Sequence, residues 1–165
     1  MKNIILVGFM GTGKTAVGKE LAKKLKMKFI DMDDIIKKRE GMEISDIFKQ
    51  KGESYFRDVE KEVAREVSKQ SNLVIAAGGG VVINKENVKN LKSNGIMICL
   101  NASPDKILER TKRYTHRPLL NVPEPSKRVW ELLAKRAQYY ARADYQIDTT
   151  NLTIDEVVQK ILKII

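Results

Sequence analysis

Short apolar runs alternate with longer amphipathic stretches along the chain. The runs at 4–7, 73–77 and 96–100 are continuously apolar, which is typical of strands buried on both faces of a sheet. After the first run, apolar residues recur every four positions and predict the buried face of a helix: Val17, Leu21 and Leu25. This alternation predicts an α/β fold in which helices cover both faces of a parallel sheet.

The remaining elements follow from the same patterns. A short strand is expected from Phe29 into the acidic residues at 31–34. Helices are then expected over about 43–49 and 53–69, with a break at Gly52. Further helices are predicted after Asn84, and over 104–111, 126–142 and from 153 onward, with a short strand near 145–147.

Residues 112–125 are polar, rich in Arg and Pro, and without clear periodicity. We interpret them as a mobile surface segment within one domain, because 165 residues is the size of a single domain with a substantial core. No segment approaches the length of a membrane span, so no membrane partner is expected.

The formal net charge is +10, from 31 Lys and Arg against 21 Asp and Glu. This balance favours anionic partners without identifying them. Many lysines have the spacing of a solvated helix face, so we expect no nucleic-acid partner, although charge alone leaves that alternative open. Cys99 is the single cysteine and no secretory signal precedes the first strand; both observations predict a cytoplasmic protein.

Residues 8–15, Gly-Phe-Met-Gly-Thr-Gly-Lys-Thr, fit the pattern G-x-x-x-x-G-K-[ST] between a strand and a helix. Glycines let the main chain approach phosphate oxygens closely, and the following helix presents its positive N-terminal end. Lys14 can reach the β- and γ-phosphates, and the Thr15 hydroxyl can bind Mg²⁺. The loop therefore predicts a nucleoside-triphosphate site of the P-loop type.

The strand at 73–77 runs into three glycines at 78–80, where many P-loop enzymes carry a Walker-B aspartate. A bare backbone there predicts the close approach of a bulky ligand. The missing carboxylate would come from Asp31 or Asp33, which share one face if the segment is extended. One could orient Mg²⁺, directly or through water, and the other could accept a hydrogen bond from an attacking hydroxyl. Asp34 would point the other way and cap a helix.

Six stretches, in their order and spacing, resemble the shikimate kinase family: residues 8–15, Asp-Met-Asp at 31–33, Gly-Glu-Ser-Tyr-Phe-Arg at 52–57, Ala-Ala-Gly-Gly-Gly at 76–80, Arg-Pro-Leu-Leu at 117–120 and Arg-Ala-Gln-Tyr-Tyr at 136–140. The resemblance covers essentially the whole chain. It implies one P-loop kinase domain over 1–165 with five parallel strands in the order 2-3-1-4-5. It also implies a mobile lid at about 112–125 and a shikimate-binding helical region at about 33–62.

The activity that the resemblance implies is transfer of the γ-phosphoryl group of ATP to the 3-hydroxyl of shikimate, a step of aromatic amino acid biosynthesis. ATP would be the co-substrate and Mg²⁺ the cofactor, held by Thr15 and, through water, by Asp31. A monomer is expected.

The same resemblance assigns roles to individual residues. Arg57 and Arg136 would hold the shikimate carboxylate, which suits the planar fork of a guanidinium. Asp33 would hold ring hydroxyls, including the reactive one, and Gly78, Gly79 and Gly80 would close over the ring. The catalytic residues would be Lys14, Asp33 and Arg117, with Arg117 carried by the lid and Arg113 as its competitor. The residues expected to contact ATP are Gly11, Thr12, Gly13, Lys14, Thr15, Ala16, Arg110, Arg117 and Asn151.

Two other function classes remain as alternatives. Another small-molecule P-loop kinase, of the gluconate or nucleoside-monophosphate type, would share the phosphate loop. A nucleoside-monophosphate enzyme would also need a base pocket, which the acceptor residues above do not supply. A basic nucleic-acid-binding NTPase would need stacking aromatic residues along one groove, and the few aromatic residues here are scattered.

Overall fold

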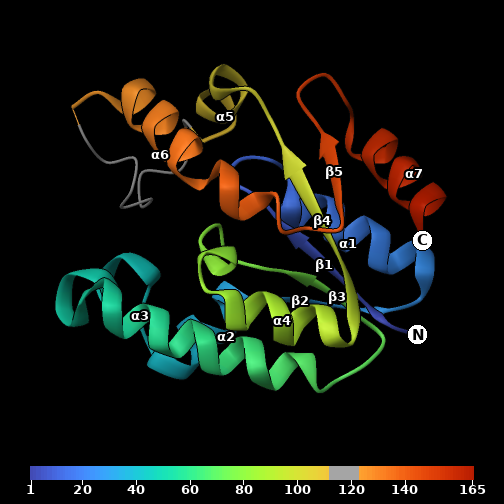
Figure 1. The fold of residues 1–165 in the computed structure, drawn as a ribbon, viewed down its shortest axis with the longest axis horizontal. Helices are drawn as coiled ribbons and strands as arrows, with labels where there is room; N and C mark the ends of the chain where they lie inside the picture. The colour runs from blue at the N-terminus through green and yellow to red at the C-terminus, as the bar shows by residue number, and fades with distance from the viewer. Residues whose placement is uncertain (112–122) are drawn as a thin grey trace.

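A five-stranded parallel sheet forms the centre of the structure, a computed structural model that describes residues 1–111 and 123–165. Its order is β2-β3-β1-β4-β5, as predicted, and every neighbouring pair is parallel (Figure 1). The strands are β1 (Asn3–Val7), β2 (Lys28–Asp31), β3 (Leu73–Ala76), β4 (Gly95–Asn101) and β5 (Tyr145–Asp148).

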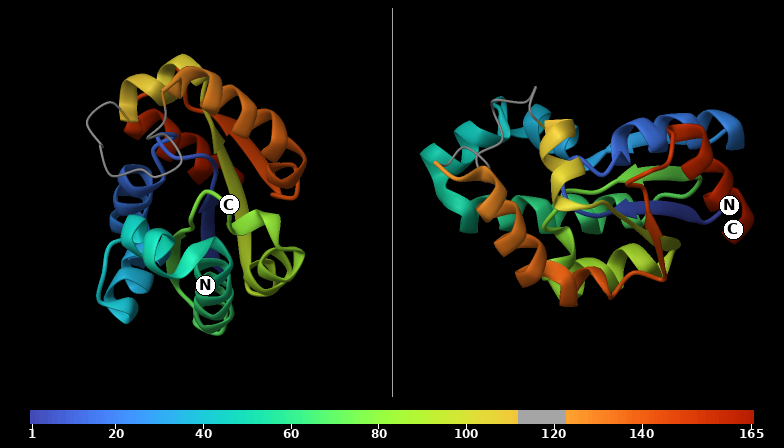
Figure 2. Two further views of the ribbon diagram at one scale, coloured as in Figure 1. Left: turned by 90° about the vertical axis from the view of Figure 1, so that its left-hand side faces the viewer. Right: turned by 90° about the horizontal axis from the view of Figure 1, so that it is seen from above.

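Helices cover both faces of this sheet (Figure 2). They are α1 (Lys14–Leu25), α2 (Met32–Glu40), α3 (Ile44–Ser68), α4 (Lys85–Ser93), α5 (Pro104–Thr111), α6 (Pro125–Tyr140) and α7 (Ile154–Ile164), with a 3₁₀ turn, η1 (Val81–Ile83), before α4. In the part of the chain that the structure describes, none of the helices is long and apolar enough to cross a bilayer.

The central strand β1 contributes side chains to the two hydrophobic clusters, one on each face of the sheet. Ile4 and Leu6 pack in a cluster with residues of α1 and α7, whereas Ile5 and Val7 pack with residues of α3, α4 and α6. Consecutive side chains of a strand point to opposite faces, so a strand between two helical layers needs apolar residues at every position. This explains the unbroken apolar run that predicted β1.

The acidic segment after β2 differs from the prediction. The strand ends at Asp31, and helix α2 begins at the next residue. The Oδ1 atom of Asp31 accepts a hydrogen bond of 2.8 Å from the Asp33 N–H and so caps this helix. The expectation that Asp31 and Asp33 share one face of an extended segment is therefore wrong, and Asp31, not Asp34, is the cap.

The predicted break at Gly52 is confirmed. This residue lies within α3 at φ 85° and ψ 166°, so the helix is kinked there. Two predicted helix starts are also confirmed by side-chain caps. Asn84 accepts a hydrogen bond from the Glu86 N–H, and Thr153 forms a reciprocal pair with Glu156.

Most of the segment predicted as a lid, residues 112–122, lies outside the described part of the chain, and so does Arg117. Of the remaining residues, Pro125 is the first residue of α6. Its fixed φ suits the first turn of a helix. The lid itself stays a prediction.

Candidate active site

A cavity of about 350 Å³ lies where the chain leaves the carboxyl ends of β1, β2 and β3. Ligands of open parallel sheets bind at this edge. The cavity brings together most of the site residues predicted from the sequence: Gly11, Gly13, Lys14, Thr15, Ala16, Asp31, Asp33, Arg57, Gly78, Gly79, Gly80, Arg110 and Arg136. One cavity therefore contains both the phosphate loop and the predicted acceptor residues.

The phosphate loop begins at Gly8, directly after β1. Gly8 has a φ of +137°, and a Cβ atom there would lie 2.2 Å from the carbonyl oxygen of Leu100. Only glycine fits this combination of backbone conformation and close packing. The ammonium of Lys14 donates to the carbonyls of Gly8 and Phe9. The Lys14 side chain thus folds along the loop at the N-terminus of α1, where the helix end favours anions.

The loop is also tied to the other end of the chain. The guanidinium of Arg110 donates to the carbonyl oxygens of Gly11 at 3.2 Å and Thr149 at 2.9 Å. The Thr149 hydroxyl in turn donates to the carbonyl of Thr12 at 3.0 Å. Asn151, a predicted ATP contact, is exposed two residues further on and does not line the cavity.

Thr12 shapes the loop from within. It is 1% exposed, and its hydroxyl donates to the Phe9 carbonyl at 2.7 Å. Its side chain is absent from the cavity wall. A nucleotide contact by Thr12 would therefore have to come from its backbone.

The side chains of Thr15 and Asp31 lie close together, which the predicted Mg²⁺ site requires. The Thr15 hydroxyl donates to Oδ2 of Asp31 at 3.3 Å. Among the described residues, no cluster of three or more His, Cys, Asp or Glu could hold a metal. Mg²⁺ in phosphoryl-transfer sites needs only one or two protein oxygens, because phosphates and water supply the rest. The Thr15–Asp31 pair fits that kind of site.

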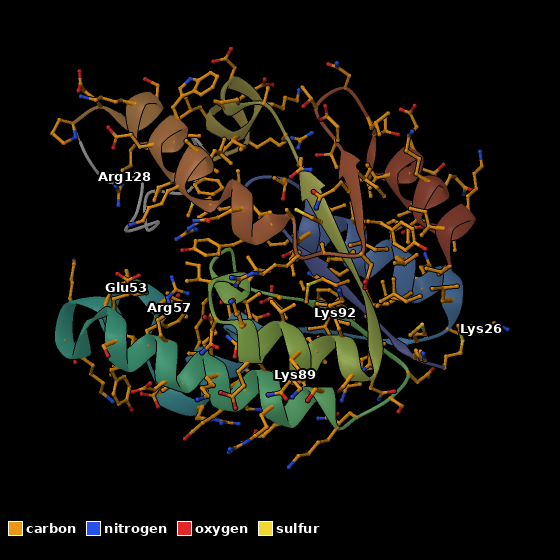
Figure 3. The ribbon with its side chains drawn as sticks, viewed as in Figure 1. Lys26, Glu53, Arg57, Lys89, Lys92 and Arg128 are labelled. Atoms are coloured by element: carbon orange, nitrogen blue, oxygen red, sulfur yellow. The ribbon has the colours of Figure 1, made fainter. Side chains whose placement is uncertain are left out.

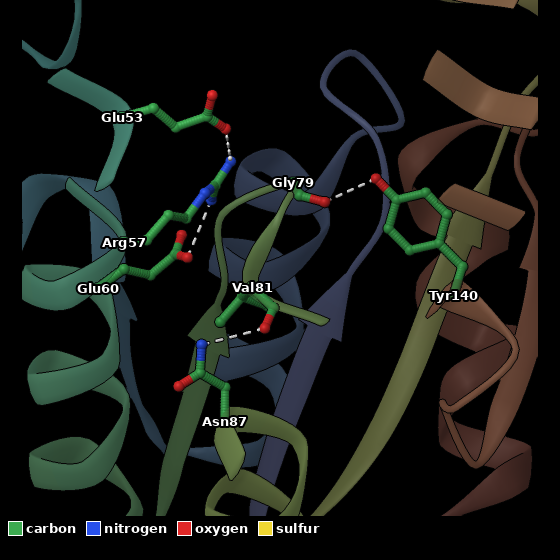
Figure 4. Close-up of polar contacts among 7 residues, drawn as sticks. All are labelled: Glu53, Arg57, Glu60, Gly79, Val81, Asn87 and Tyr140. Carbon is green, nitrogen blue, oxygen red and sulfur yellow. Dashed lines mark hydrogen bonds and ion pairs between the residues drawn. The ribbon is translucent and has the colours of Figure 1, made fainter. Parts of the chain in front are cut away.

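Arg57 reaches the cavity from α3 and is held by two glutamates. Its Nη1 atom lies 2.9 Å from Oε1 of Glu60, and its Nη2 atom lies 3.4 Å from Oε1 of Glu53. Figure 4 draws both contacts, and Figure 3 shows Arg57 and Glu53 on the side of α3 that faces α6. The Glu60 side chain is only 2% exposed. Burial raises the pKa of Glu60, and the neighbouring charge of Arg57 opposes that rise.

Glu60 was not among the residues predicted from the sequence. Its spacing of three residues from Arg57 on a helix is the signal that could have pointed to it.

Arg136 reaches the same region from α6. It is 4% exposed, and its Cζ atom lies 5.8 Å from the centre of the Phe9 ring. The glycines that follow β3 lie between the two arginines. A Cβ on Gly79 would be 3.6 Å from Nη1 of Arg136, and one on Gly80 would be 2.6 Å from the Arg57 nitrogens. A side chain at Gly80 would displace the Arg57 guanidinium, so the bare backbone lets both cations approach the same space.

Asp33 lies in the first turn of α2 and faces the first of these glycines. A Cβ on Gly78 would lie 3.2 Å from Oδ1 of Asp33 and 3.1 Å from Oε2 of Glu60. Both carboxylates therefore border the acceptor end of the cavity. Asp33 and Lys14 are the described members of the predicted catalytic set.

Tyr140 is a second residue that the sequence analysis did not single out. Its hydroxyl donates a hydrogen bond of 2.7 Å to the carbonyl oxygen of Gly79. The ring is 5% exposed. Burial raises the pKa of Tyr140 to about 12, while the positive charge of Arg136 opposes the rise. The phenol thus remains protonated and able to donate over the ordinary pH range.

The chain resembles known proteins over nearly its whole length. The sequence model of the shikimate kinase family matches residues 10–165. A shikimate kinase from Thermodesulfovibrio yellowstonii is 54% identical over 99% of this chain and 94% of its own. One from Caldanaerobacter subterraneus subsp. tengcongensis is 47% identical, covering 99% of this chain and 95% of its own. Both similarities extend over nearly the full length of each protein.

Solved structures give the same result. A shikimate kinase from Acinetobacter baumannii in complex with shikimate matches with a TM-score of 0.95 and 39% identity, over 99% of this chain and 92% of that one. A gluconokinase from Sinorhizobium meliloti matches at 0.60 with 17% identity, over 98% and 90% of the two chains, and shares the fold alone. This chain belongs to the shikimate kinase family.

Proposed function

We propose that this protein phosphorylates shikimate with ATP, transferring the γ-phosphoryl group to the 3-hydroxyl of the ring. The observation that carries the proposal is the single cavity in which the phosphate loop faces Arg57, Arg136 and the glycines at 78–80. A P-loop alone identifies a phosphate donor. Two guanidinium groups and a bare backbone at the opposite end identify a bulky anionic acceptor.

At the donor end, the backbone of Gly11, Thr12 and Gly13 and the start of α1 would bind the ATP phosphates, together with Lys14, Thr15 and Ala16. These groups combine inward-facing N–H donors with the positive end of a helix. Arg110, which already bridges Gly11 and Thr149, would border the nucleotide at the cavity wall.

At the acceptor end, Arg57 and Arg136 would bind the carboxylate of shikimate. Guanidinium groups match a carboxylate with two parallel hydrogen bonds. Arg136 is buried and Arg57 is held by Glu60, so neither needs much reorganisation before binding. The segment that supplies Asp33 and Arg57, residues 33–62, would form the acceptor-binding region.

Thr15 and Asp31 would hold Mg²⁺, with Asp31 acting directly or through water. A bound Mg²⁺ neutralises charge on the phosphates. Asp31 can serve both the cation and the α2 cap, because its two oxygens have different partners: Oδ2 meets the Thr15 hydroxyl and Oδ1 accepts from the Asp33 N–H.

Asp33 would accept a hydrogen bond from the attacking hydroxyl and orient it toward the γ-phosphorus. Phosphoryl transfer passes through a loose transition state, so orientation contributes more than full proton removal before attack. We propose Arg117, from the predicted lid, as the cation that stabilises the charge on the transferring oxygens.

The test is ADP release measured over a panel of acceptors with and without Mg²⁺. Shikimate, gluconate and a nucleoside monophosphate represent the competing P-loop kinases. We expect turnover with shikimate and Mg²⁺, and rates near background with the other two acceptors. Turnover with gluconate or the nucleotide but not with shikimate would overturn the proposal.

A further inference from the structure

The segment that follows β3 is held from outside the cavity by three side chains. The Tyr140 hydroxyl donates to the Gly79 carbonyl at 2.7 Å, Asn87 Nδ2 donates to the Val81 carbonyl at 3.1 Å, and Arg142 Nη1 donates to the Val82 carbonyl at 2.7 Å. The first two contacts appear in Figure 4. Each of these bonds fixes a carbonyl direction, and therefore also the direction of the N–H in the same peptide plane.

The bond from Tyr140 also sets the direction of the N–H in the peptide between Gly79 and Gly80. No cis peptide is found in the described residues, and in a trans peptide the C=O and N–H point in opposite directions. The Gly79 carbonyl points to Tyr140, so the Gly80 N–H points to the opposite side. Figure 4 shows Arg57 on that opposite side, and the Cβ position of Gly80 is only 2.6 Å from the Arg57 nitrogens.

Gly80 is a buried residue, and its N–H makes no hydrogen bond among the described residues. A buried N–H without a partner costs free energy that a ligand acceptor atom can recover. The guanidinium of Arg57 lies beside Gly80 and marks this side of the cavity as the anion end.

Glycine occupies both positions flanking this peptide. Without Cβ atoms, the backbone can rotate the plane with little steric penalty. The hydrogen bond from the Tyr140 hydroxyl restrains this rotation, which Cβ atoms at the two positions would otherwise limit. Tyr140 is itself fixed, because it is buried and lies four residues after Arg136 on the same face of α6.

We propose that Tyr140 is a positioning residue of the acceptor site, whose hydroxyl holds the Gly79 carbonyl and thereby aims the Gly80 N–H at the carboxylate of the acceptor. The acceptor identity rests on the proposed function, whereas the alignment of the peptide does not. Tyr140 need not touch the substrate.

Removal of the hydroxyl tests this role. In Tyr140→Phe, we expect the Kd for shikimate to rise about tenfold, the order of one misaligned hydrogen bond to a charged group, while the Kd for ADP changes less than about twofold. Titration calorimetry measures both. The matched control is Tyr139→Phe, which keeps the ring that stacks under Arg142 at 4.9 Å, and both affinities should stay unchanged. Equal losses for shikimate and ADP, or no loss, would overturn the proposal.

Amide NMR provides a readout that does not depend on the variant binding anything. Without ligand, the Gly80 amide should exchange with solvent faster in Tyr140→Phe than in the unaltered protein or in Tyr139→Phe. Equal exchange rates would overturn the positioning role. If the unaltered protein failed to bind shikimate, the proposed function would fall, but this exchange measurement would still decide the role of Tyr140.

A further measurement uses only the unaltered protein, in case Tyr140→Phe does not fold. Addition of shikimate should shift the Gly80 amide resonance more than those of Gly78 and Gly79. A Gly80 shift no larger than theirs would show that its N–H is not the aimed donor.

Discussion

The carboxylate of Glu60 and the guanidinium of Arg57 form an ion pair of 2.9 Å in which Glu60 is 2% exposed and Arg57 is 25% exposed. Because Glu60 is buried, its carboxylate cannot move outward with the arginine, and the ion pair therefore fixes the position of the Arg57 guanidinium. Glu53, at 3.4 Å, is 59% exposed and offers a weaker restraint.

Glu60→Ala should therefore weaken acceptor binding through Arg57. We expect the KM for shikimate to rise about tenfold or more, because a guanidinium without its buried partner loses its preferred direction. The KM for ATP should stay within about twofold, since the phosphate loop is untouched. The control Glu53→Ala should change neither value appreciably. Similar effects of the two substitutions would contradict the positioning of Arg57 by Glu60.

Arg136→Ala should raise the KM for shikimate about a hundredfold, because it removes the buried one of the two guanidinium groups proposed to bind the carboxylate. The KM for ATP should change far less. Steady-state kinetics with each substrate varied in turn gives both numbers, and Lys135→Ala, an exposed neighbour on α6, is the control. Equal increases in the two KM values would refute the assigned role.

Asp31→Asn should raise the Mg²⁺ concentration needed for half-maximal activity about tenfold, because an amide oxygen is a poorer Mg²⁺ ligand than a carboxylate. The substitution is mild for the fold, since asparagine caps helices as well as aspartate does, so the melting temperature should hardly move. Asp58→Asn removes an exposed charge from α3 and should leave Mg²⁺ activation unchanged. An unchanged Mg²⁺ requirement in Asp31→Asn would place the cation elsewhere.

Arg117→Ala should lower kcat about a hundredfold or more while changing the shikimate KM little, as expected for a cation that acts on the transferring phosphoryl group. Arg113→Ala is the comparison within the same predicted lid, and we expect it to retain most of its kcat. Single-turnover measurements would separate the chemical step from product release. A normal kcat in Arg117→Ala, with a loss in Arg113→Ala, would exchange the two assignments.

Cys99 should make the fold sensitive to alkali. It is fully buried in β4, and burial raises the pKa of its thiol from 9.0 to about 12. Between these values the unfolded chain releases the thiol proton and the folded chain keeps it, so stability falls as pH rises above 9. One such group costs about 1.4 kcal/mol by pH 10.

Urea unfolding of the protein and of Cys99→Ala at pH 8 and pH 10 checks this. The variant is expected to be less stable at pH 8, because it leaves a cavity, but to lose less stability on the way to pH 10. Other titrating groups are common to both proteins and cancel in the difference. Parallel losses would show that the thiol ionises equally in the folded and unfolded states.

The sheet and the phosphate loop were predictable because their determinants are local. A parallel strand covered on both faces requires an unbroken apolar run, as at β1, β3 and β4. The glycines of the loop let the main chain approach phosphate oxygens, and Lys14 supplies a positive charge, so both are recognisable in the sequence. The strand order came from the family resemblance and is confirmed.

Helix α2 was missed because its local signal is weak. Only Met32 and Ile36 of its nine residues are fully buried, and the acidic residues at 31, 33 and 34 also suit the end of a strand. The cap at Asp31 depends on backbone geometry that the pattern does not specify.

The sequence marks Glu60 only by its spacing of three residues from Arg57, and Tyr140 only by its place at the end of the stretch 136–140. Glu60 lies among charged residues on α3, and only the packing around it distinguishes it from Asp58 and Glu62, which are exposed. Tyr140 acts on Gly79, which lies 61 residues earlier in the chain. Both are defined by tertiary contacts.

The hydroxyl of Thr149, which lies 3.0 Å from the carbonyl oxygens of both Thr12 and Asn101 and can donate its one proton to either, also sets the smallest fragment that can bind a nucleotide. A chain cut after α6 would retain every residue of the phosphate motif. It would lose the bond to Thr12 and the carbonyl that anchors Arg110, and with them the shape of the loop. Removal of β5 together with Thr149 should thus abolish nucleotide affinity, so the motif cannot be transplanted as an independent phosphate-binding unit.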